Sequence, residues 1–302
     1  MSNSADRLFH LQNRYAPYLF VAPFVALFCT FGLYPLIKSV VLSFYITSGP
    51  RSQIFVGLDN FRFLLGDPSF RRAVLNTAVF AVCSVFLQLP LSLALALLLN
   101  YRRLWGRNVF RLCFFSPRLV GMVFVGVLFS VIFAAPYGLL NVGLHGVFGM
   151  SLERAWLGDP KLVMPALVMT ALWMYVGFNM IYFLAALQGV DRTLYEAATV
   201  DGANALQRFW HVTLPSIKPV AVFVVVLSTI GSFQLFELPY LMLSNTPGPD
   251  EAGLTIVMYL YQNGFITGDL GYASAIGWTL ALCVLVLAVG QMRLSGTWKK
   301  EA

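Results

Sequence analysis

The chain alternates between long apolar runs and short polar connections. A helix needs about 20 consecutive apolar residues to cross the hydrocarbon core of a bilayer. Runs of that length stand at Tyr18–Tyr45, Ala73–Leu99, Cys113–Ala135, Leu162–Leu187, Ile217–Leu243 and Ala273–Met292. The pattern therefore predicts an all-α integral membrane protein, built as a bundle of about six transmembrane helices.

Three prolines, Pro23, Pro35 and Pro90, lie inside the first two runs. Neighbouring helices can satisfy the carbonyl groups that proline frees, so we expect kinks rather than helix ends. The first run is too long for the core of a signal peptide, and we expect it to be retained. We predict one transmembrane domain over residues 1–302, with an N-terminal segment and first span in 1–47 and a core in 73–293.

Composition supports a membrane protein and excludes several other classes. The chain is 59% hydrophobic and only 11% charged, whereas soluble domains are about 25% charged. The net charge of +7 lies in short loops rather than in a nucleic-acid-binding patch. The cysteines and histidines are scattered, and no nucleophile triad, metal-ligand spacing or phosphate-binding loop occurs. We expect no enzyme activity, no catalytic residue, no metal and no ATP site on this chain.

Basic residues predict the orientation of the spans, because cytoplasmic loops carry the excess of Lys and Arg. Twelve basic residues fall on one side: Arg7, Arg14, Arg102, Arg103, Arg107, Arg111, Arg192, Arg208, Lys218, Arg293, Lys299 and Lys300. Six fall on the other: Arg51, Arg62, Arg71, Arg72, Arg154 and Lys161. Both termini and the connection at 190–219 are therefore expected in the cytoplasm.

The polar connection at 190–219 predicts a helix, a tight turn and a second helix. Thr193 and Glu196 fit a capping box that starts the first helix. Gly202 can take a positive φ and suits the reversal, and Asn204 can cap the second helix. Leu206, Phe209 and Trp210 would then share one apolar face. Spacing alone leaves open that Glu196 only caps its own helix or that this face anchors at the membrane surface.

The same connection carries a motif: Glu196-Ala197-Ala198, Asp201-Gly202-Ala203, Phe209 and Leu214-Pro215. It resembles the EAA loop of ABC importer permeases, whose short coupling helix sits in a groove on an ATP-hydrolysing subunit. The resemblance implies that Glu196 makes the charged contact with that subunit and that Gly202 makes the turn. The other implied members of this ATPase-coupling set are Ala197, Ala198, Asp201, Ala203, Phe209, Leu214 and Pro215.

Weaker motifs in matching order extend the resemblance over almost the whole chain. They stand at Tyr34-Pro35, Ser43-Phe44, Val56–Phe61, Asp67–Phe70, Asn76-Thr77, Phe110-Arg111, Tyr137–Asn141, Trp156–Asp159, Gly231–Phe233, Gly248-Pro249 and Thr255. Together they resemble carbohydrate-type permeases related to maltose and glycerol-phosphate importers. The chain departs from that pattern at Val190-Asp191, at Pro247 and at Ser116-Pro117-Arg118, which puts local turn geometry and substrate fit in doubt.

The resemblance implies the architecture of an ABC type I importer permease that moves a sugar or sugar-like solute through the plasma (inner) membrane. It implies as partners a second homologous permease subunit, a cytoplasmic ABC ATPase dimer and an extracytoplasmic solute-binding protein. ATP and Mg would bind the ATPase subunits, and this chain would hold no cofactor. Two alternatives stay open: an ABC permease for a non-carbohydrate solute, and an ion-driven secondary transporter, for which Glu237 alone is thin support.

Polar and aromatic groups inside the spans are candidates for the solute pathway, because such groups are costly in lipid. Five residues fit: Trp173, Asn179, Ser232, Gln234 and Glu237. Aromatic faces suit sugar rings, while amides and carboxylates can bond to sugar hydroxyls. Interhelical hydrogen bonding and packing is the alternative role for each of them.

Overall fold

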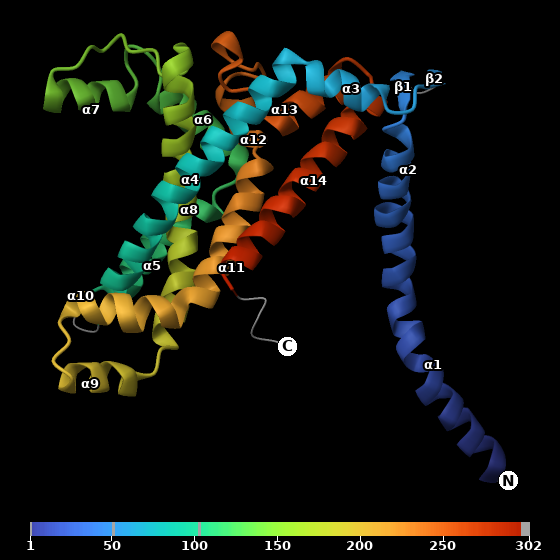
Figure 1. The fold of residues 1–302 in the computed structure, drawn as a ribbon, viewed down its shortest axis with the longest axis horizontal. Coiled ribbons are helices and arrows are strands. Elements are labelled where there is room, and N and C mark those ends of the chain that lie inside the picture. Colours follow the sequence, from blue (N-terminus) through green and yellow to red (C-terminus); the bar gives the residue numbers. More distant parts are fainter. Residues whose placement is uncertain (1, 50–51, 102–103, 297–302) are drawn as a thin grey trace. The chain divides into compact units, whose positions relative to one another are not determined.

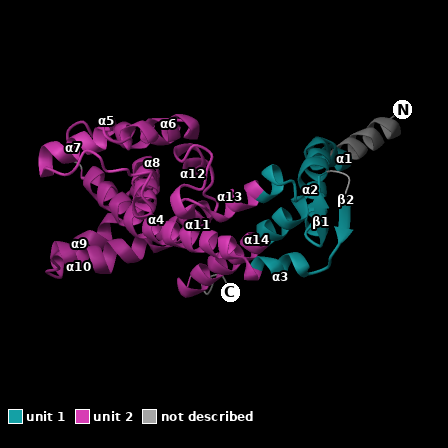
Figure 2. Ribbon diagram, turned by 90° about the horizontal axis from the view of Figure 1, so that it is seen from above, with its two compact units in different colours: residues 1–64, 263–278 teal, residues 65–262, 279–302 magenta. Residues whose placement is uncertain are grey.

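The computed structural model describes residues 2–49, 52–101 and 104–296, apart from the side chains of residues 2–13 and 52. Five basic residues of the topology prediction, and the side chain of Arg7, lie outside this description; the five are Arg51, Arg102, Arg103, Lys299 and Lys300. The chain divides into two compact units, Met1–Leu64 with Asn263–Trp278, and Leu65–Gln262 with Thr279–Ala302 (Figure 2). The helices confirm the predicted all-α class.

Unit 1 contains the first predicted span and a short hairpin. Helix α1 (Ser2–Phe28) continues through a π-helical turn, η1 (Cys29–Leu33), into α2 (Tyr34–Leu42). Strands β1 (Tyr45–Ser48) and β2 (Ser52–Phe55) pair antiparallel, and α3 (Asp59–Gly66) follows. The helix continues through Pro23 as expected, and the π-helical turn directly precedes the Tyr34-Pro35 pair.

Buried polar side chains hold the hairpin of unit 1 in place. Asn60 Nδ2 donates to the carbonyl oxygens of Ser43 and Tyr45, each at 2.9 Å. Asp269 Oδ1 accepts from the Thr47 amide at 3.1 Å and from the Thr47 hydroxyl at 3.2 Å. These bonds satisfy backbone groups at the end of α2 and in β1.

Three long helices form the centre of unit 2: α4 (Pro68–Asn100), α8 (Pro160–Gln188) and α11 (Leu214–Phe233). The first two start in the same way, with an aspartate cap followed by proline. Asp67 accepts from the Ser69 amide, and Asp159 accepts from the Lys161 amide, each at 2.9 Å. Helix α4 runs on through Pro90, as predicted.

Two apolar clusters fill unit 2. The members of the first that are 2% exposed or less are Val125, Val163, Ala166, Leu167, Ala171, Met174, Leu238 and Met242. The second joins α4, α8 and the start of α11, and its most buried members are Ala96, Met180, Ile217 and Val224. The two clusters make α8 the central helix of the unit, since it contributes to both.

The third predicted span is not one straight helix, and that prediction is corrected. Helix α5 (Arg107–Phe115) and the 3₁₀ turn η2 (Ser116–Leu119) meet α6 (Met122–Ile132) at a bend of 98°. Pro117 has no amide hydrogen to donate, and Gly121 is extended at φ −63° and ψ 143°. Proline and glycine therefore end the helical ladder inside the apolar run Cys113–Ala135.

The fifth predicted span also differs, because α11 ends at Phe233 and not near Leu243. A break at Gln234–Phe236 leads into α12 (Glu237–Met242). Thr255 Oγ1 donates to the Leu235 carbonyl at 2.7 Å, which supplies the broken segment with a partner from elsewhere in the unit. A buried helix break is tolerated where such a partner exists.

The remaining elements are α7 (Leu139–Phe148), α9 (Arg192–Val200), α10 (Ala205–Arg208), η3 (Phe209–Thr213), η4 (Pro249–Glu251), α13 (Ile256–Tyr261), η5 (Gln262–Ile266) and α14 (Leu270–Leu294). Among the described residues, five helices are long and apolar enough to span a membrane, or six if the bent α5–α6 pair counts as one. Within unit 2, α9 and α10 lie at one end and α7 at the other (Figure 1).

Gly177 of α8 gives a test of this packing. A Cβ there would lie 1.7 Å from the Phe114 carbonyl oxygen of α5, so the two backbones must move apart. We expect Gly177→Ala to destabilise the detergent-solubilised protein by about 1–3 kcal/mol, as overpacking does. Gly290→Ala on α14, where a Cβ meets nothing within 4 Å, is the control. Equal thermal unfolding temperatures for the two variants would contradict the close approach.

Candidate functional site: a protruding loop and a polar cavity

The loop at one end of unit 2 has the predicted order of helix, turn and helix. Helix α9 ends in a Schellman motif, in which the Ala203 amide bonds to the Ala198 carbonyl at 2.9 Å and the Gly202 amide to the Thr199 carbonyl at 3.1 Å. Gly202 has φ +78°, and a Cβ added at this residue would meet nothing within 4 Å. Backbone conformation, and not lack of space, is therefore the reason for glycine here.

The helix caps differ in part from the prediction. Asp191, and not Thr193, caps α9, since its Oδ1 accepts from the Thr193 amide at 2.9 Å. This hydrogen bond lowers the pKa of the Asp191 carboxyl, because it favours the charged form. The capping box stands one helix later, between Asn204 and Gln207, which confirms Asn204 as the cap of the second helix.

Two side-chain contacts fix the helices of the loop against each other. The Tyr195 hydroxyl on α9 and the buried Thr213 hydroxyl at the end of η3 are 2.9 Å apart. Arg208 Nη1 donates to Thr199 Oγ1, also at 2.9 Å. The loop is therefore a preformed unit that is continuous with α11, where Leu214 follows Thr213 directly.

The Glu196 carboxylate is exposed on α9, and among the described residues no group bonds to it. The role that spacing left open, of capping its own helix, is thus excluded. Leu206 and Trp210 of the apolar face are 67% and 56% exposed, while Phe209 packs edge-on against Trp210. The loop presents an unpaired charge beside uncovered apolar surface. This is the composition of an interface for another macromolecule or a membrane surface.

The structure places all members of the predicted coupling set on this protrusion. Those of α9 and its turn are Glu196, Ala197, Ala198, Asp201, Gly202 and Ala203. Phe209 begins η3, and Leu214 and Pro215 begin α11. Of this set, Ala198, Ala203, Phe209 and Leu214 are half-buried, and the others are exposed.

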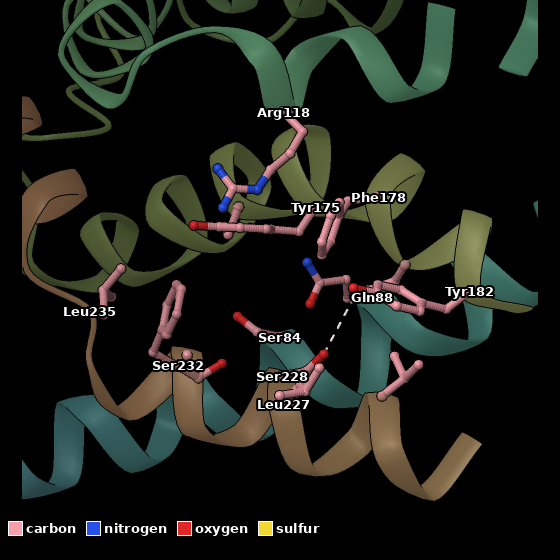
Figure 3. Close-up of a pocket in the computed structure, with 15 residues that line it drawn as sticks. Ser84, Gln88, Arg118, Tyr175, Phe178, Tyr182, Leu227, Ser228, Ser232 and Leu235 are labelled. Atoms are coloured by element: carbon pink, nitrogen blue, oxygen red, sulfur yellow. Dashed lines mark hydrogen bonds between the residues drawn. The ribbon is translucent and has the colours of Figure 1, made fainter. Parts of the chain in front are cut away.

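A cavity of about 210 Å³ lies between α4, α8, α11 and the turn η2 (Figure 3). Its polar lining groups are Ser84, Gln88, Arg118, Tyr175, Asn179, Tyr182, Ser228 and Ser232, and Phe80 and Phe178 add further aromatic rings. No acidic side chain is among the described residues that line it. The rest of the lining is apolar, so the cavity combines an apolar wall with a few convergent hydrogen-bonding groups, as small-molecule sites do.

Several of these polar groups have spare hydrogen-bonding capacity. The Ser84 hydroxyl is buried and has no partner among the described residues. Asn179 Nδ2 donates only a long bond, 3.4 Å, to Ser228 Oγ. The Arg118 guanidinium lies 5.4 Å from the ring centres of both Tyr175 and Phe178, which places a cation over aromatic faces at the cavity wall (Figure 3). A buried polar group without a partner costs free energy, which a bound solute could recover.

The predicted pathway residues divide into two groups. Asn179 and Ser232 line the cavity. Trp173 is 41% exposed and packs edge-on against Phe129, Gln234 is the C-cap of α11, and Glu237 starts α12 as an exposed residue. These last three are absent from the described lining of this cavity.

Sequence reasoning missed six polar lining residues: Ser84, Gln88, Arg118, Tyr175, Tyr182 and Ser228. A signal for some of them was present. Ser84 and Gln88 are four residues apart within an apolar run, and Ser228 and Ser232 repeat that spacing. Residues four apart share one face of a helix, so each pair indicated a polar stripe on a membrane helix.

The fold and this cavity define a multi-pass helical membrane protein with a polar site inside its bundle. The family "Binding-protein-dependent transport system inner membrane component" matches residues 88–295. The arabinooligosaccharides transport system permease protein AraP of Bacillus subtilis (strain 168) is 40% identical, covering 96% of this chain and 91% of AraP. The lactose transport system permease protein LacF of Rhizobium radiobacter is 36% identical, with 90% and 91% covered.

Among solved structures, a bacterial ABC transporter involved in the import of the acidic polysaccharide alginate is similar to this chain. Its TM-score is 0.83 at 26% identity, with 96% of this chain and 99% of that chain covered. The chain belongs to the family of binding-protein-dependent transport system inner membrane components. It is an inner-membrane permease of the carbohydrate ABC importer type.

The contacts within the loop generate a prediction. Tyr195→Phe removes the hydroxyl that contacts Thr213, so α9 loses one of its two side-chain ties. A hydrogen bond of this kind contributes about 1 kcal/mol, so we expect amide hydrogen exchange in α9 to rise roughly fivefold. Tyr101→Phe, at an exposed residue outside the loop, is the control. Unchanged exchange in α9 would show that the contact does not hold the loop.

Proposed function

We propose that this chain moves a sugar or sugar-like solute inward by coupling ATP hydrolysis on partner subunits to alternating access. The observation that carries this proposal is the protruding loop. It is prefolded, it exposes the unpaired Glu196 carboxylate, and it is joined directly to α11, one wall of the polar cavity. The partners are a second homologous permease, a cytoplasmic ABC ATPase dimer and an extracytoplasmic solute-binding protein. ATP and Mg bind the ATPase dimer.

In the proposed coupling, movement of the ATPases is transmitted to α11 through side-chain contacts of the loop. Glu196 pairs with a basic residue of the ATPase, and the small Ala197 lets the two surfaces approach closely. Closure of the ATPases moves α9, the Tyr195–Thr213 contact transfers this movement to η3, and α11 follows. Two arrangements of the bundle, each favoured by a different ligand state, then expose the cavity to opposite sides in turn.

The cavity supports a sugar as the solute. Tyr175 and Tyr182 offer aromatic faces to the apolar faces of a sugar ring, while Gln88 and Asn179 offer amides to its hydroxyls. The names of the relatives refer to arabinooligosaccharides and lactose, and the similar solved transporter imports alginate. These compounds share hydroxyl-rich rings, and this supports the substrate class without selecting one sugar.

The proposed orientation has both termini and the loop in the cytoplasm, where an ATPase can reach Glu196. It is supported by the excess of basic residues on that side of the predicted spans. An ion-driven secondary transporter would use carboxylates within the membrane, and no acid lines the cavity among the described residues. A non-carbohydrate solute is the other alternative, which an uptake panel distinguishes.

Loss of coupling is the first test. Glu196→Ala removes the charged contact, and Gly202→Asp forces a side chain into the backbone conformation at φ +78°. We expect both variants to insert normally but to lose ATPase association or substrate-stimulated ATP hydrolysis by about tenfold, as for a charged hydrogen-bonded contact. Glu153→Ala, an exposed acid at the other end of unit 2, should behave as wild type. If both loop variants kept full activity, the loop would be only a connection between helices and not the element that couples to the ATPase.

Solute transport by the cavity is tested separately. Asn179→Leu replaces an amide with an apolar side chain of similar shape, so a solute hydroxyl would lose its partner. We expect uptake to fall about tenfold while the ATPase subunits stay bound, because an unmatched polar group costs roughly 1–3 kcal/mol. Ser130→Ala, at a hydroxyl of α6 that bonds only its own helix, is the control. In a solute panel on the assembled complex, uptake of only non-carbohydrate compounds would exclude the sugar.

A further inference from the structure

A second pocket, of about 780 Å³, lies where four elements of unit 2 meet beside the loop. It is lined by the end of α4, the start of α5, the end of α8 and the start of α9. The residues are Asn100, Arg107, Arg111, Leu187, Gln188, Val190, Arg192 and Tyr195. The lining thus contains three arginines, and the described residues place no acid among them. Among these lining residues, Tyr195 also takes part in the proposed coupling, through its contact with Thr213.

The three arginines of this pocket have no acidic partner among its described lining residues. Arg107 and Arg111 are four residues apart on α5, so they are neighbours on one helix face. The Arg111 Nε and Nη2 atoms are buried and have no hydrogen-bond partner among the described residues. Unpartnered guanidinium hydrogens and adjacent like charges both favour binding of an anion.

The surroundings of the arginines indicate the depth of the pocket in the membrane. Trp105 is 93% exposed two residues before Arg107, and tryptophan is enriched at the interface between lipid and water. Phe114, three residues after Arg111 on the same face of α5, is 40% exposed, and Phe110, three residues after Arg107, is 47% exposed, so apolar surface continues along the helix from the pocket. An occupant should therefore have an anionic head for the arginines and an apolar part for α5.

We propose that this pocket binds the phosphate group of an anionic phospholipid, with its acyl chains along α5. Guanidinium groups match phosphate oxygens through paired hydrogen bonds, and basic pockets between membrane helices suit such head groups. Arg107 and Arg111 hold the phosphate from α5, and Arg192 reaches it from α9. The bound lipid joins α5 to the loop. Its binding needs no transport, so the proposal stands or fails independently of the proposed function.

The test is native mass spectrometry of the full chain in mild detergent with defined lipids. The probes are dioleoylphosphatidylglycerol and, at equal concentration, zwitterionic dioleoylphosphatidylcholine. We expect wild type to retain the anionic lipid preferentially. The double variant Arg107→Gln/Arg111→Gln should lower that retention about tenfold, as loss of charged hydrogen bonds does. Arg71→Gln, which removes the same charge at the other end of α4, should retain the lipid as wild type does.

Several outcomes would overturn the proposal. These are equal retention of the two lipids, no loss in the double variant, or an equal loss in Arg71→Gln. Displacement of the lipid by excess inorganic phosphate would assign the pocket to a soluble anion instead. If the assembled transporter lacks the lipid and the double variant releases the ATPase, a protein carboxylate fills the pocket. Arg192→Gln, on the exposed start of α9, should weaken lipid retention without affecting the bundle, which tests the site if the double variant misfolds.

Discussion

The rest of this structure depends on one constraint, that a backbone polar group inside a membrane bundle must find a partner within the protein. The long helices satisfy it alone, but this bundle also contains breaks. At one break the Thr255 hydroxyl donates to the Leu235 carbonyl, and at the start of α13 the Ile256 amide donates to Thr77 Oγ1. Asn76 Nδ2 bonds to the carbonyls of Glu251 and Leu254 at 2.8 and 3.0 Å. Buried side chains thus replace the missing helical hydrogen bonds.

Many of the weak sequence motifs have this physical meaning. Asn141 Nδ2 bonds to the carbonyls of Leu152 and Arg154, each at 2.9 Å, and its Oδ1 accepts from the indole of Trp156 at 2.7 Å. Asn60 does the same for two carbonyls in unit 1. A side-chain amide can donate and accept hydrogen bonds at the same time, so it can satisfy the backbone carbonyls of an irregular segment that has no helical hydrogen bonds of its own. The motif residue Thr255 therefore fixes the break after α11, where Leu235 lies at the wall of the cavity.

The sequence predicted the regular parts of the molecule well, for a physical reason. Apolar length alone decides whether a segment can span a bilayer, so α4, α8 and α14 were found within a few residues. Gly202 and Asn204 were found because positive φ and helix caps are local properties. Pro90 and Pro117 show where prediction from the sequence fails. Both lie in apolar runs, yet one is inside a continuous helix and the other stands at a 98° bend. The extended Gly121 follows Pro117, whereas no glycine follows Pro90 in α4, and hydropathy does not record this difference.

The sequence analysis did not predict the cavity or the basic pocket, because the residues that line each of them come from elements far apart in the sequence. Two elements nevertheless join them to the loop. Helix α5 carries Arg111 in the basic pocket and leads through η2 to Arg118 at the cavity. Tyr195 of α9 lines the basic pocket and contacts Thr213 at the start of α11, which lines the cavity. Movement of the loop is thus expected to reach the cavity from two sides, through α5 and through α11. An anion held in the basic pocket would determine how firmly the loop is connected to α5.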